Sequence, residues 1–224
     1  MASEMVYRNF AKETSHAIRY LLAVAFGLLF ISCSDPKFKP EWTKERAPEQ
    51  FSAQFETTKG NFEITVTRSF SPHAADRFYQ LVRHGYYDNS IFYRVVPDFV
   101  AQFGNTDTVV MNKWRAVRIP DEKVICGNVR GTVSFARSAP ETRDLEVFIN
   151  LKDNRTLDTL NFEGVRGFPA FGKVTKGIDV VDKLYSGYGE STMTDENLYL
   201  NRAAFYRSFP KLDLIKSAHI MNDK

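Results

Sequence analysis

The sequence is poor in the residues that mark several common protein classes. It has only 2 cysteines in 224 residues, which excludes a small fold held together by disulfides. Its 12 glycines and 9 prolines are too few for collagen or for a chain disordered throughout. Basic and acidic side chains nearly balance, at 30 Lys and Arg against 27 Asp and Glu, and the basic residues form no block. We therefore expect no nucleic-acid partner.

The sequence also lacks an apolar run of the roughly 20 residues that a bilayer-spanning helix needs. The run at residues 20–32 (YLLAVAFGLLFIS) has 13 residues and follows Arg8, Lys12 and Arg19. Basic residues before a short apolar core are typical of a secretory signal peptide. We predict a signal peptide over residues 1–32.

The end of this run resembles the lipobox of bacterial lipoproteins, in which a Cys is lipidated and becomes the mature N-terminus. The matching residues are Ile31-Ser32-Cys33-Ser34. The resemblance implies a lipid anchor at Cys33 that holds the protein to a membrane of the bacterial cell envelope, facing the periplasm or the exterior. The alternative is an ordinary signal peptide followed by an incidental Cys. If Cys33 is lipidated, Cys126 has no disulfide partner within the chain.

Residues 35–49 (DPKFKPEWTKERAPE) combine Pro with many charges and show no apolar periodicity. Such composition is typical of a solvated linker. We therefore predict a lipidated Cys and a flexible tether over residues 33–49, and one folded domain over residues 50–224. No interface signal argues against a monomer.

The chain contains 19 Phe and 10 Tyr, enough for a sizeable core, and the apolar residues of the predicted domain mostly follow strand periodicity. Two alternating runs joined by Thr58-Lys59-Gly60 predict a hairpin, and Ser71-Pro72 begins a predicted helix that ends at Gly85. A second short helix is predicted at residues 178–185. Further strands are predicted at residues 91–96, 99–103, 131–136, 147–150, 170–174 and 212–221, with long polar loops at 104–123 and 152–167. Many short strands with few helices predict a mainly β antiparallel barrel or sandwich.

The polar segment 188–208 has two interpretations. It either forms a short helix that packs on the domain through Leu198, Leu200, Phe205 and Tyr206, or it is a surface loop.

Other chemistries find little support. Residues 167–174 approximate a phosphate-binding loop, but Val174 replaces the hydroxyl residue that would hold the metal. The four His residues are scattered, without metal-ligand spacing, and Ser134 lacks the context of a hydrolase nucleophile. We expect neither a metal nor a cofactor.

Four segments, in the right order, resemble the cyclophilins, a family of peptidyl-prolyl cis-trans isomerases. The first matches the family's Phe-His-Arg segment, the second its Met-Ala strand, the third its Phe-Phe-Ile segment and the fourth its Phe-Gly strand. They are residues 92–102 (FYRVVPDFVAQ), 131–137 (GTVSFAR), 147–150 (VFIN) and 171–174 (FGKV). The resemblance runs from about residue 53 to the end and implies a closed eight-stranded antiparallel barrel capped by two α-helices.

The resemblance also implies site residues. Arg94 matches the catalytic arginine, and Gln102 matches the amide that binds the substrate carbonyl and orients that arginine. Without the resemblance, Arg94 would be interpreted as a solvated strand residue. The substrate-binding positions are Phe99, Val100, Ala136, Arg137, Glu146, Phe148, Leu157 and Phe168, which otherwise would suggest core or surface packing.

Several of these positions depart from the family. Arg137 stands in place of a pocket Asn, Glu146 in place of a Gln, Thr156 in place of a frequent Trp, and Phe168 in place of a His. A carboxylate near Arg94 could either hold the guanidinium or compete for its donors. We expect Glu146 to pair mainly with Arg137, which would leave Arg94 free.

Two functions follow. The first is an isomerase that accelerates Xaa-Pro isomerisation during the folding of exported proteins. The second is a catalytically weak proline-binding chaperone or interaction module on the same fold. Both bind proline-containing peptides and unfolded proteins and reach the membrane through the lipid anchor.

Overall fold

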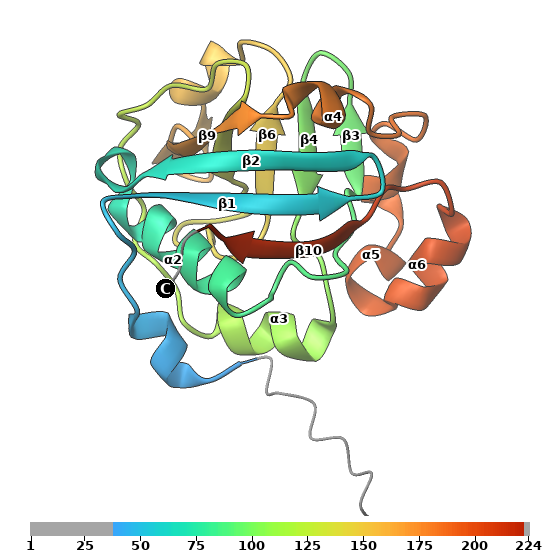
Figure 1. The fold of residues 1–224 in the computed structure, drawn as a ribbon, viewed down its shortest axis with the longest axis horizontal. Coiled ribbons are helices and arrows are strands. Elements are labelled where there is room, and N and C mark those ends of the chain that lie inside the picture. The colour runs from blue at the N-terminus through green and yellow to red at the C-terminus, as the bar shows by residue number, and fades with distance from the viewer. Residues whose placement is uncertain (1–37, 222–224) are drawn as a thin grey trace, which may run out of the picture. The chain divides into compact units, whose positions relative to one another are not determined.

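The computed structural model describes residues 38–221, which form one folded unit dominated by an antiparallel sheet (Figure 1). The predicted signal peptide and Cys33 lie outside these residues. The sheet has eight strands in the order β10-β1-β2-β9-β5-β6-β4-β3. Their bounds are β1 Gln50–Thr57, β2 Gly60–Thr67, β3 Arg94–Val96, β4 Val100–Phe103, β5 Thr132–Phe135, β6 Val147–Asn150, β9 Ala170–Lys176 and β10 Ile215–Ile220.

The predicted hairpin is confirmed in β1 and β2, which pair in register over their full length. Alternate residues of both strands face the core, and the rings of Phe55 and Phe62 stack with centroids 5.0 Å apart. Gly60 ends the turn with φ near +124°, a conformation that favours glycine. The period-2 pattern therefore sets which face of this hairpin is buried.

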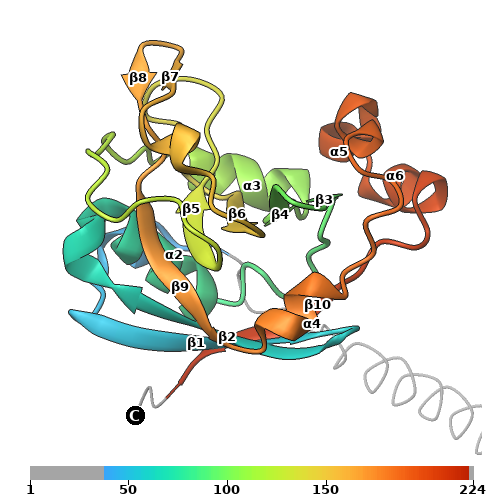
Figure 2. The same ribbon diagram turned by 90° about the horizontal axis from the view of Figure 1, so that it is seen from above.

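The sheet curls into a half-barrel, which confirms the mainly β, eight-stranded antiparallel fold class (Figure 2). The edge strands β3 and β10 share no ladder, and the chain segments around their starts make short contacts. An isolated bridge joins Ile91 to Leu214, and the Ile215 amide donates to the Ser90 carbonyl at 2.8 Å. The strand predicted at residues 91–96 is therefore shorter, because its first half makes these edge contacts.

Helix α2 (Pro72–Arg83) packs its apolar face on the sheet, as predicted. The Phe78 ring lies between Phe55 and Phe171, at centroid distances of 6.1 and 5.0 Å. The Glu122 carboxylate caps the helix, accepting from the amides of residues 73 and 74 at 2.9 and 3.2 Å and from the Ser71 hydroxyl. The helix start thus depends on a residue far along the chain.

The described residues contain more helices than the two predicted. Helix α4 (Ile178–Asp182) is confirmed but ends earlier than predicted. Helix α3 (Thr108–Arg115) lies inside the segment predicted as a polar loop, so that prediction is wrong there. The Asp107 carboxylate caps α3 by accepting from two backbone amides, and the α3 residues Met111 and Trp114 are buried.

The segment 188–208 is helical, which decides between its two interpretations. It contains α5 (Asn197–Leu200) and α6 (Arg202–Ser208), which lie together beside β3 (Figures 1 and 2). Leu198 and Phe205 are buried as predicted, whereas Leu200 is 72% exposed, so its predicted packing role is wrong.

The predicted tether is wrong for residues 38–49, because these residues pack on the domain. A 3-10 helix covers Pro40–Lys44, and its Trp42 ring stacks on His84 with centroids 3.9 Å apart. Phe38 contacts Trp114, and Ala47 is buried. Two aromatic residues among many charges gave no periodic signal.

Within residues 38–221, no helix has the length and apolarity to cross a bilayer.

We predict that Glu122→Ala strongly destabilises the fold. The Glu122 carboxylate caps α2 and also accepts from Arg143 Nη2 at 3.1 Å, and the Arg143 side chain is fully buried. The substitution removes the α2 cap together with one of the two carboxylates that compensate the buried Arg143, the other being Asp121 at 3.3 Å from Arg143 Nε, so urea unfolding should show a loss of about 2–4 kcal/mol. The exposed Glu41 serves as the control, and Glu41→Ala should leave the unfolding free energy unchanged. Equal stability of the two variants would contradict this account.

Candidate active site

A cavity of about 760 Å³ opens above strands β3, β4 and β6. The rest of its wall comes from α3, the segment before β6, the short hairpin of β7 (Asn161–Phe162) and β8 (Val165–Arg166), and the segment around α5. The structure brings all ten predicted catalytic and substrate-binding residues to this one cavity. They are Arg94, Phe99, Val100, Gln102, Ala136, Arg137, Glu146, Phe148, Leu157 and Phe168.

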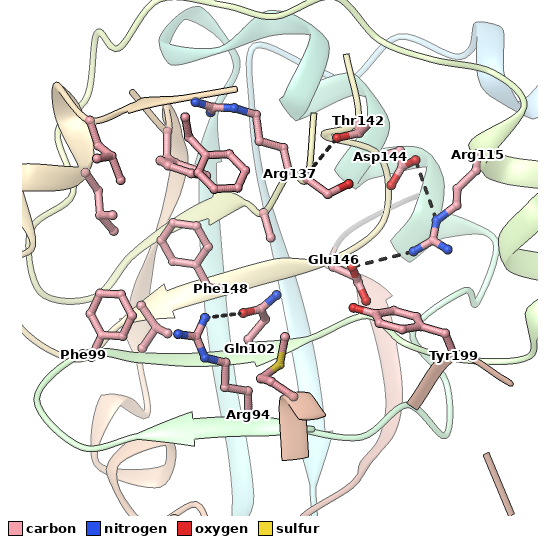
Figure 3. A pocket seen from close by; sticks show the side chains of 18 of the residues that line it. Arg94, Phe99, Gln102, Arg115, Arg137, Thr142, Asp144, Glu146, Phe148 and Tyr199 are labelled. Atoms are coloured by element: carbon pink, nitrogen blue, oxygen red, sulfur yellow. Dashed lines mark hydrogen bonds and ion pairs between the residues drawn. The ribbon is translucent and has the colours of Figure 1, made fainter. Parts of the chain in front are cut away.

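Strand register places Arg94 beside Gln102. The two residues are direct partners across β3 and β4, and Arg94 Nη1 donates to Gln102 Oε1 at 3.1 Å. The guanidinium carbon also lies 5.3 Å from the centre of the Phe99 ring, within the range of a cation–π contact. Figure 3 shows the guanidinium between Phe99 and Gln102. The predicted convergence of Arg94 and Gln102 from neighbouring strands is confirmed.

Arg94 has a second partner that the sequence does not predict. The Glu190 carboxylate accepts from Arg94 Nε at 2.9 Å and from Arg94 Nη2 at 2.7 Å, which makes a bidentate ion pair. Glu190 lies 96 residues further along the chain, in a polar segment that also contains Glu196. Nothing in the sequence distinguished it. The expectation that Arg94 is free of a carboxylate is therefore wrong.

The floor of the cavity beside Arg94 is apolar. Val100, Phe148 and Phe168 form a buried cluster, with Phe99, Ala136 and Leu157 packed against it. The Phe148 and Phe168 rings meet edge to face at 6.1 Å. We call this apolar cluster the bowl, and its Phe99 ring contacts the Arg94 guanidinium.

Two hydrogen bonds fix the backbone at Phe99. Its carbonyl accepts from Asn154 Nδ2 at 2.8 Å and from the Leu151 amide at 2.9 Å. Asn154 Nδ2 also donates to Asn150 Oδ1 at 2.8 Å, and Asn150 is fully buried. Hydrogen bonds therefore hold the aromatic edge of the bowl in place.

Arg137 does not pair with Glu146, so that prediction is wrong. Its guanidinium donates to the backbone carbonyls of Val165, at 2.7 Å, and Gly167, and lies 4.0 Å from the centre of the Phe168 ring. Burial lowers the pKa of Arg137. Arg137 thus holds the segment that carries Phe168 against the bowl.

Glu146 faces Arg115 on α3, with its Oε2 3.7 Å from Arg115 Nη2. Asp144 lies near the same guanidinium, at 3.9 Å, and Figure 3 places Tyr199 beside Glu146. Burial raises the pKa of Glu146 to about 7, although Arg115 acts in the opposite direction. Arg115 could not be identified from the sequence, because α3 was predicted as a loop.

Thr156, at the position of the family's frequent Trp, is exposed and does not line the cavity. Both tryptophans of the chain, Trp42 and Trp114, pack elsewhere, so the cavity has no indole donor.

Within residues 38–221, no three His, Cys, Asp or Glu side chains gather to hold a metal ion. Burial raises the pKa of the free Cys126 thiol, which disfavours its thiolate.

The chemistry that this arrangement supports follows from the guanidinium. Arg94 has five N–H donors, of which Glu190 takes two and Gln102 takes one. Two donors are left beside an apolar bowl. Such a site can bind a non-polar ring and stabilise an electron-rich atom attached to it.

Comparisons with known proteins agree on one family. The family model described as "Cyclophilin type peptidyl-prolyl cis-trans isomerase/CLD" matches residues 52–203. A peptidyl-prolyl cis-trans isomerase of Acinetobacter baylyi is 36% identical over 133 residues, covering 58% of this chain and 70% of that protein. Peptidyl-prolyl cis-trans isomerase B of Escherichia coli is 31% identical over 167 residues, covering 72% of this chain and 93% of the relative.

A solved structure supports the fold. The crystal structure of a cyclophilin type peptidyl-prolyl cis-trans isomerase of Cryptosporidium parvum superposes with a TM-score of 0.56. It covers 78% of this chain and 99% of its own, at 20% sequence identity.

We predict that Glu146→Gln stabilises the fold more as the pH rises. The folded state keeps a proton on Glu146 up to about pH 7, whereas the unfolded state releases it near the ordinary value of 4.5. Between these values the unfolded state is stabilised by ionising Glu146 and the folded state is not, so the wild type loses stability as the pH rises, and the Gln variant avoids this loss. The variant's advantage in unfolding free energy should grow between pH 5 and pH 8 by on the order of 2 kcal/mol.

The exposed Glu196 provides the control for this measurement, with Glu196→Gln showing no such pH trend. A constant difference between the Glu146 variant and the wild type across this range would contradict the raised pKa.

Proposed function

The chain belongs to the cyclophilin-type peptidyl-prolyl cis-trans isomerases, and we propose that it isomerises Xaa-Pro bonds in the cavity beside Arg94. The observation that carries this assignment is the Arg94 guanidinium, fixed by Gln102 at the edge of the apolar bowl. The fold supports it as well, because strands β3, β4 and β6 place both parts of the site on one face.

Rotation about an Xaa-Pro bond is slow because amide resonance opposes it. The barrier is about 18–20 kcal/mol, and the uncatalysed reaction takes tens to hundreds of seconds. The reaction breaks no covalent bond and moves no net proton. A catalyst therefore only has to bind the twisted amide more tightly than the planar one.

The residues of the cavity can meet this requirement in complementary ways. The proline ring packs into the bowl of Phe99, Phe148 and Phe168, where the amide loses water. As the bond twists, the prolyl nitrogen regains its lone pair and accepts a hydrogen bond from a free donor of Arg94. A guanidinium offers several donors in a fixed fork, so donors remain for the prolyl nitrogen after Glu190 and Gln102 have bound.

Gln102 supports the reaction from the adjacent strand. Its Oε1 already accepts from Arg94, which leaves the amide NH₂ as the donor for a substrate carbonyl oxygen. This division fixes the orientation of both the arginine and the substrate.

We predict that Arg94→Ala abolishes most of the turnover. Isomerisation of a short Xaa-Pro peptide should slow on the order of 10²-fold in kcat/KM, the typical loss when one transition-state donor is removed. The exposed Arg207 on α6, outside the cavity, gives the matched control, and Arg207→Ala should keep full activity. Full activity of the Arg94 variant would refute the assigned site.

A second function, a proline-binding chaperone, is favoured by the rim of the cavity. Leu160 and Phe162 on one side and Met193 and Tyr199 on the other line the cavity yet are more than a third exposed. Exposed apolar side chains around a binding site suit unfolded polypeptide segments. Peptide binding without any acceleration by the wild-type chain would favour this function over the isomerase.

We further propose that the chain is anchored in the bacterial envelope through a lipid on Cys33 and acts, as a monomer, on exported proteins. The basic and apolar N-terminal segment and the lipobox-like residues support this proposal.

Cys33→Ser should move the protein from the membrane fraction to the soluble fraction of expressing bacteria. Cys126→Ser retains the lipobox-like segment and should leave the protein in the membrane fraction. Unchanged fractionation of the Cys33 variant would remove the support for a lipid anchor at this residue.

A further inference from the structure

Glu190 is the only residue of the described chain whose carboxylate pairs with Arg94, and its own backbone is fixed on both sides. The preceding Gly189 forms an isolated antiparallel bridge with Val95, the neighbour of Arg94 on β3. Gly189 has φ near +52°, which favours glycine at this turn. The next residues form a 3-10 helix, Ser191–Thr194, in which the Met193 amide donates to the Glu190 carbonyl at 3.0 Å.

The segment that carries Glu190 is also anchored to the domain further along. Buried Asn105 donates through Nδ2 to the Leu198 carbonyl at 2.7 Å, and Thr108 donates to the Tyr199 carbonyl at 3.0 Å. The Leu198 and Phe205 side chains pack in a buried cluster beside β3. Glu190 therefore reaches Arg94 from a built part of the fold.

The ion pair has a geometry that orients the guanidinium. The carboxylate binds the edge formed by Nε and Nη2, so the plane of the guanidinium follows the plane of the carboxylate. Gln102 then binds Nη1. Two contacts on different edges leave the guanidinium little freedom to rotate.

The alternative is that Glu190 masks Arg94 from substrate. Two of the five N–H donors of Arg94 remain after Glu190 and Gln102 have bound, and Glu190 itself does not line the cavity. The Arg94 side chain is 21% exposed and that of Glu190 is 58% exposed, so the carboxylate lies on the outer side of the pair. This arrangement holds the arginine from outside the cavity and leaves donors for the substrate.

We propose that Glu190 is a positioning residue, which holds the Arg94 guanidinium in the orientation that donates to the prolyl nitrogen of the twisted amide. This inference rests on the proposed role of Arg94. It assigns part of the active site to the segment between α4 and α5.

The test compares Glu190→Ala and Glu190→Gln with the wild-type chain. NMR exchange on an Xaa-Pro peptide over a range of concentrations gives kcat and KM separately. Glu190→Ala should lower kcat about tenfold, which corresponds to about 1.4 kcal/mol of transition-state stabilisation. KM should be unchanged, because the apolar bowl binds the ground state. Glu190→Gln should lie between the two, since its amide oxygen still accepts from the guanidinium.

Two controls separate positioning from a general structural effect. Glu196→Ala removes an exposed carboxylate from the same segment and should leave kcat unchanged. The Nε–H proton of Arg94, assigned with an Arg94→Lys variant, should exchange slowly with solvent in the wild type and rapidly in Glu190→Ala. If the Ala variant unfolds, the Gln variant carries the test, because it keeps the volume of the side chain.

The outcomes distinguish this inference from the proposed function. Loss of activity in Arg94→Ala together with an unchanged kcat in Glu190→Ala overturns only the role of Glu190. An increase in kcat also overturns it and shows that Glu190 masks the donors. Full activity of Arg94→Ala refutes the assigned site, and the role of Glu190 with it.

Discussion

The site depends on the register of three adjacent strands. Arg94 on β3 pairs with Gln102 on β4, and Gln102 pairs with Phe148 on β6. Because side chains alternate between the two faces of a strand, these three side chains share one face of the sheet. A shift of one residue in either ladder would turn the arginine or the aromatic ring to the opposite face. The cation and the apolar bowl therefore meet only in this register.

The register is held by contacts on the other face and at the strand ends. The aromatic core under α2 packs against the sheet, while buried Asn128 accepts from Ser134 Oγ at 2.9 Å and from Asn150 Nδ2 at 3.1 Å. These buried polar groups satisfy one another, so they fix β5 and β6 without an unpaired donor. Their partner Asn154 extends the same network to Phe99, which links the interior of the fold to the edge of the bowl.

Much of the fold and the site could be predicted from the sequence, and the reasons lie in particular residues. Alternation in β1 and β2 and the helical spacing around Phe78 carry local information about burial. Helix α3 was missed because its buried face is only Met111 and Trp114, too little for a periodic signal. The packing of residues 38–49 was missed for a similar reason, since only Phe38 and Trp42 stand among charges there. Ten of the residues that line the cavity could be named because resemblance transfers positions along the chain.

Contacts between segments far apart in the sequence could not be predicted in this way. Glu190 and Arg115 come from segments without periodicity. Glu190 pairs with Arg94 and Arg115 pairs with Glu146, and the resemblance had identified both Arg94 and Glu146 as site residues. We expected the Arg94 guanidinium to be free, but a carboxylate binds it. We expected Glu146 to pair with Arg137, but it faces Arg115 on α3. Charge pairing of this kind is set by tertiary structure, so it becomes visible only once the segments are placed in space.

The central claim is that the apolar bowl and the held guanidinium together bind the twisted prolyl amide. A crystal structure of the chain with a proline-containing peptide tests it most directly. The account predicts the proline ring against Phe99, Phe148 and Phe168, with an Arg94 Nη atom within hydrogen-bond distance of the prolyl nitrogen and the Glu190 contact intact. A peptide bound elsewhere on the domain, or an Arg94 side chain turned away from the proline, would contradict it.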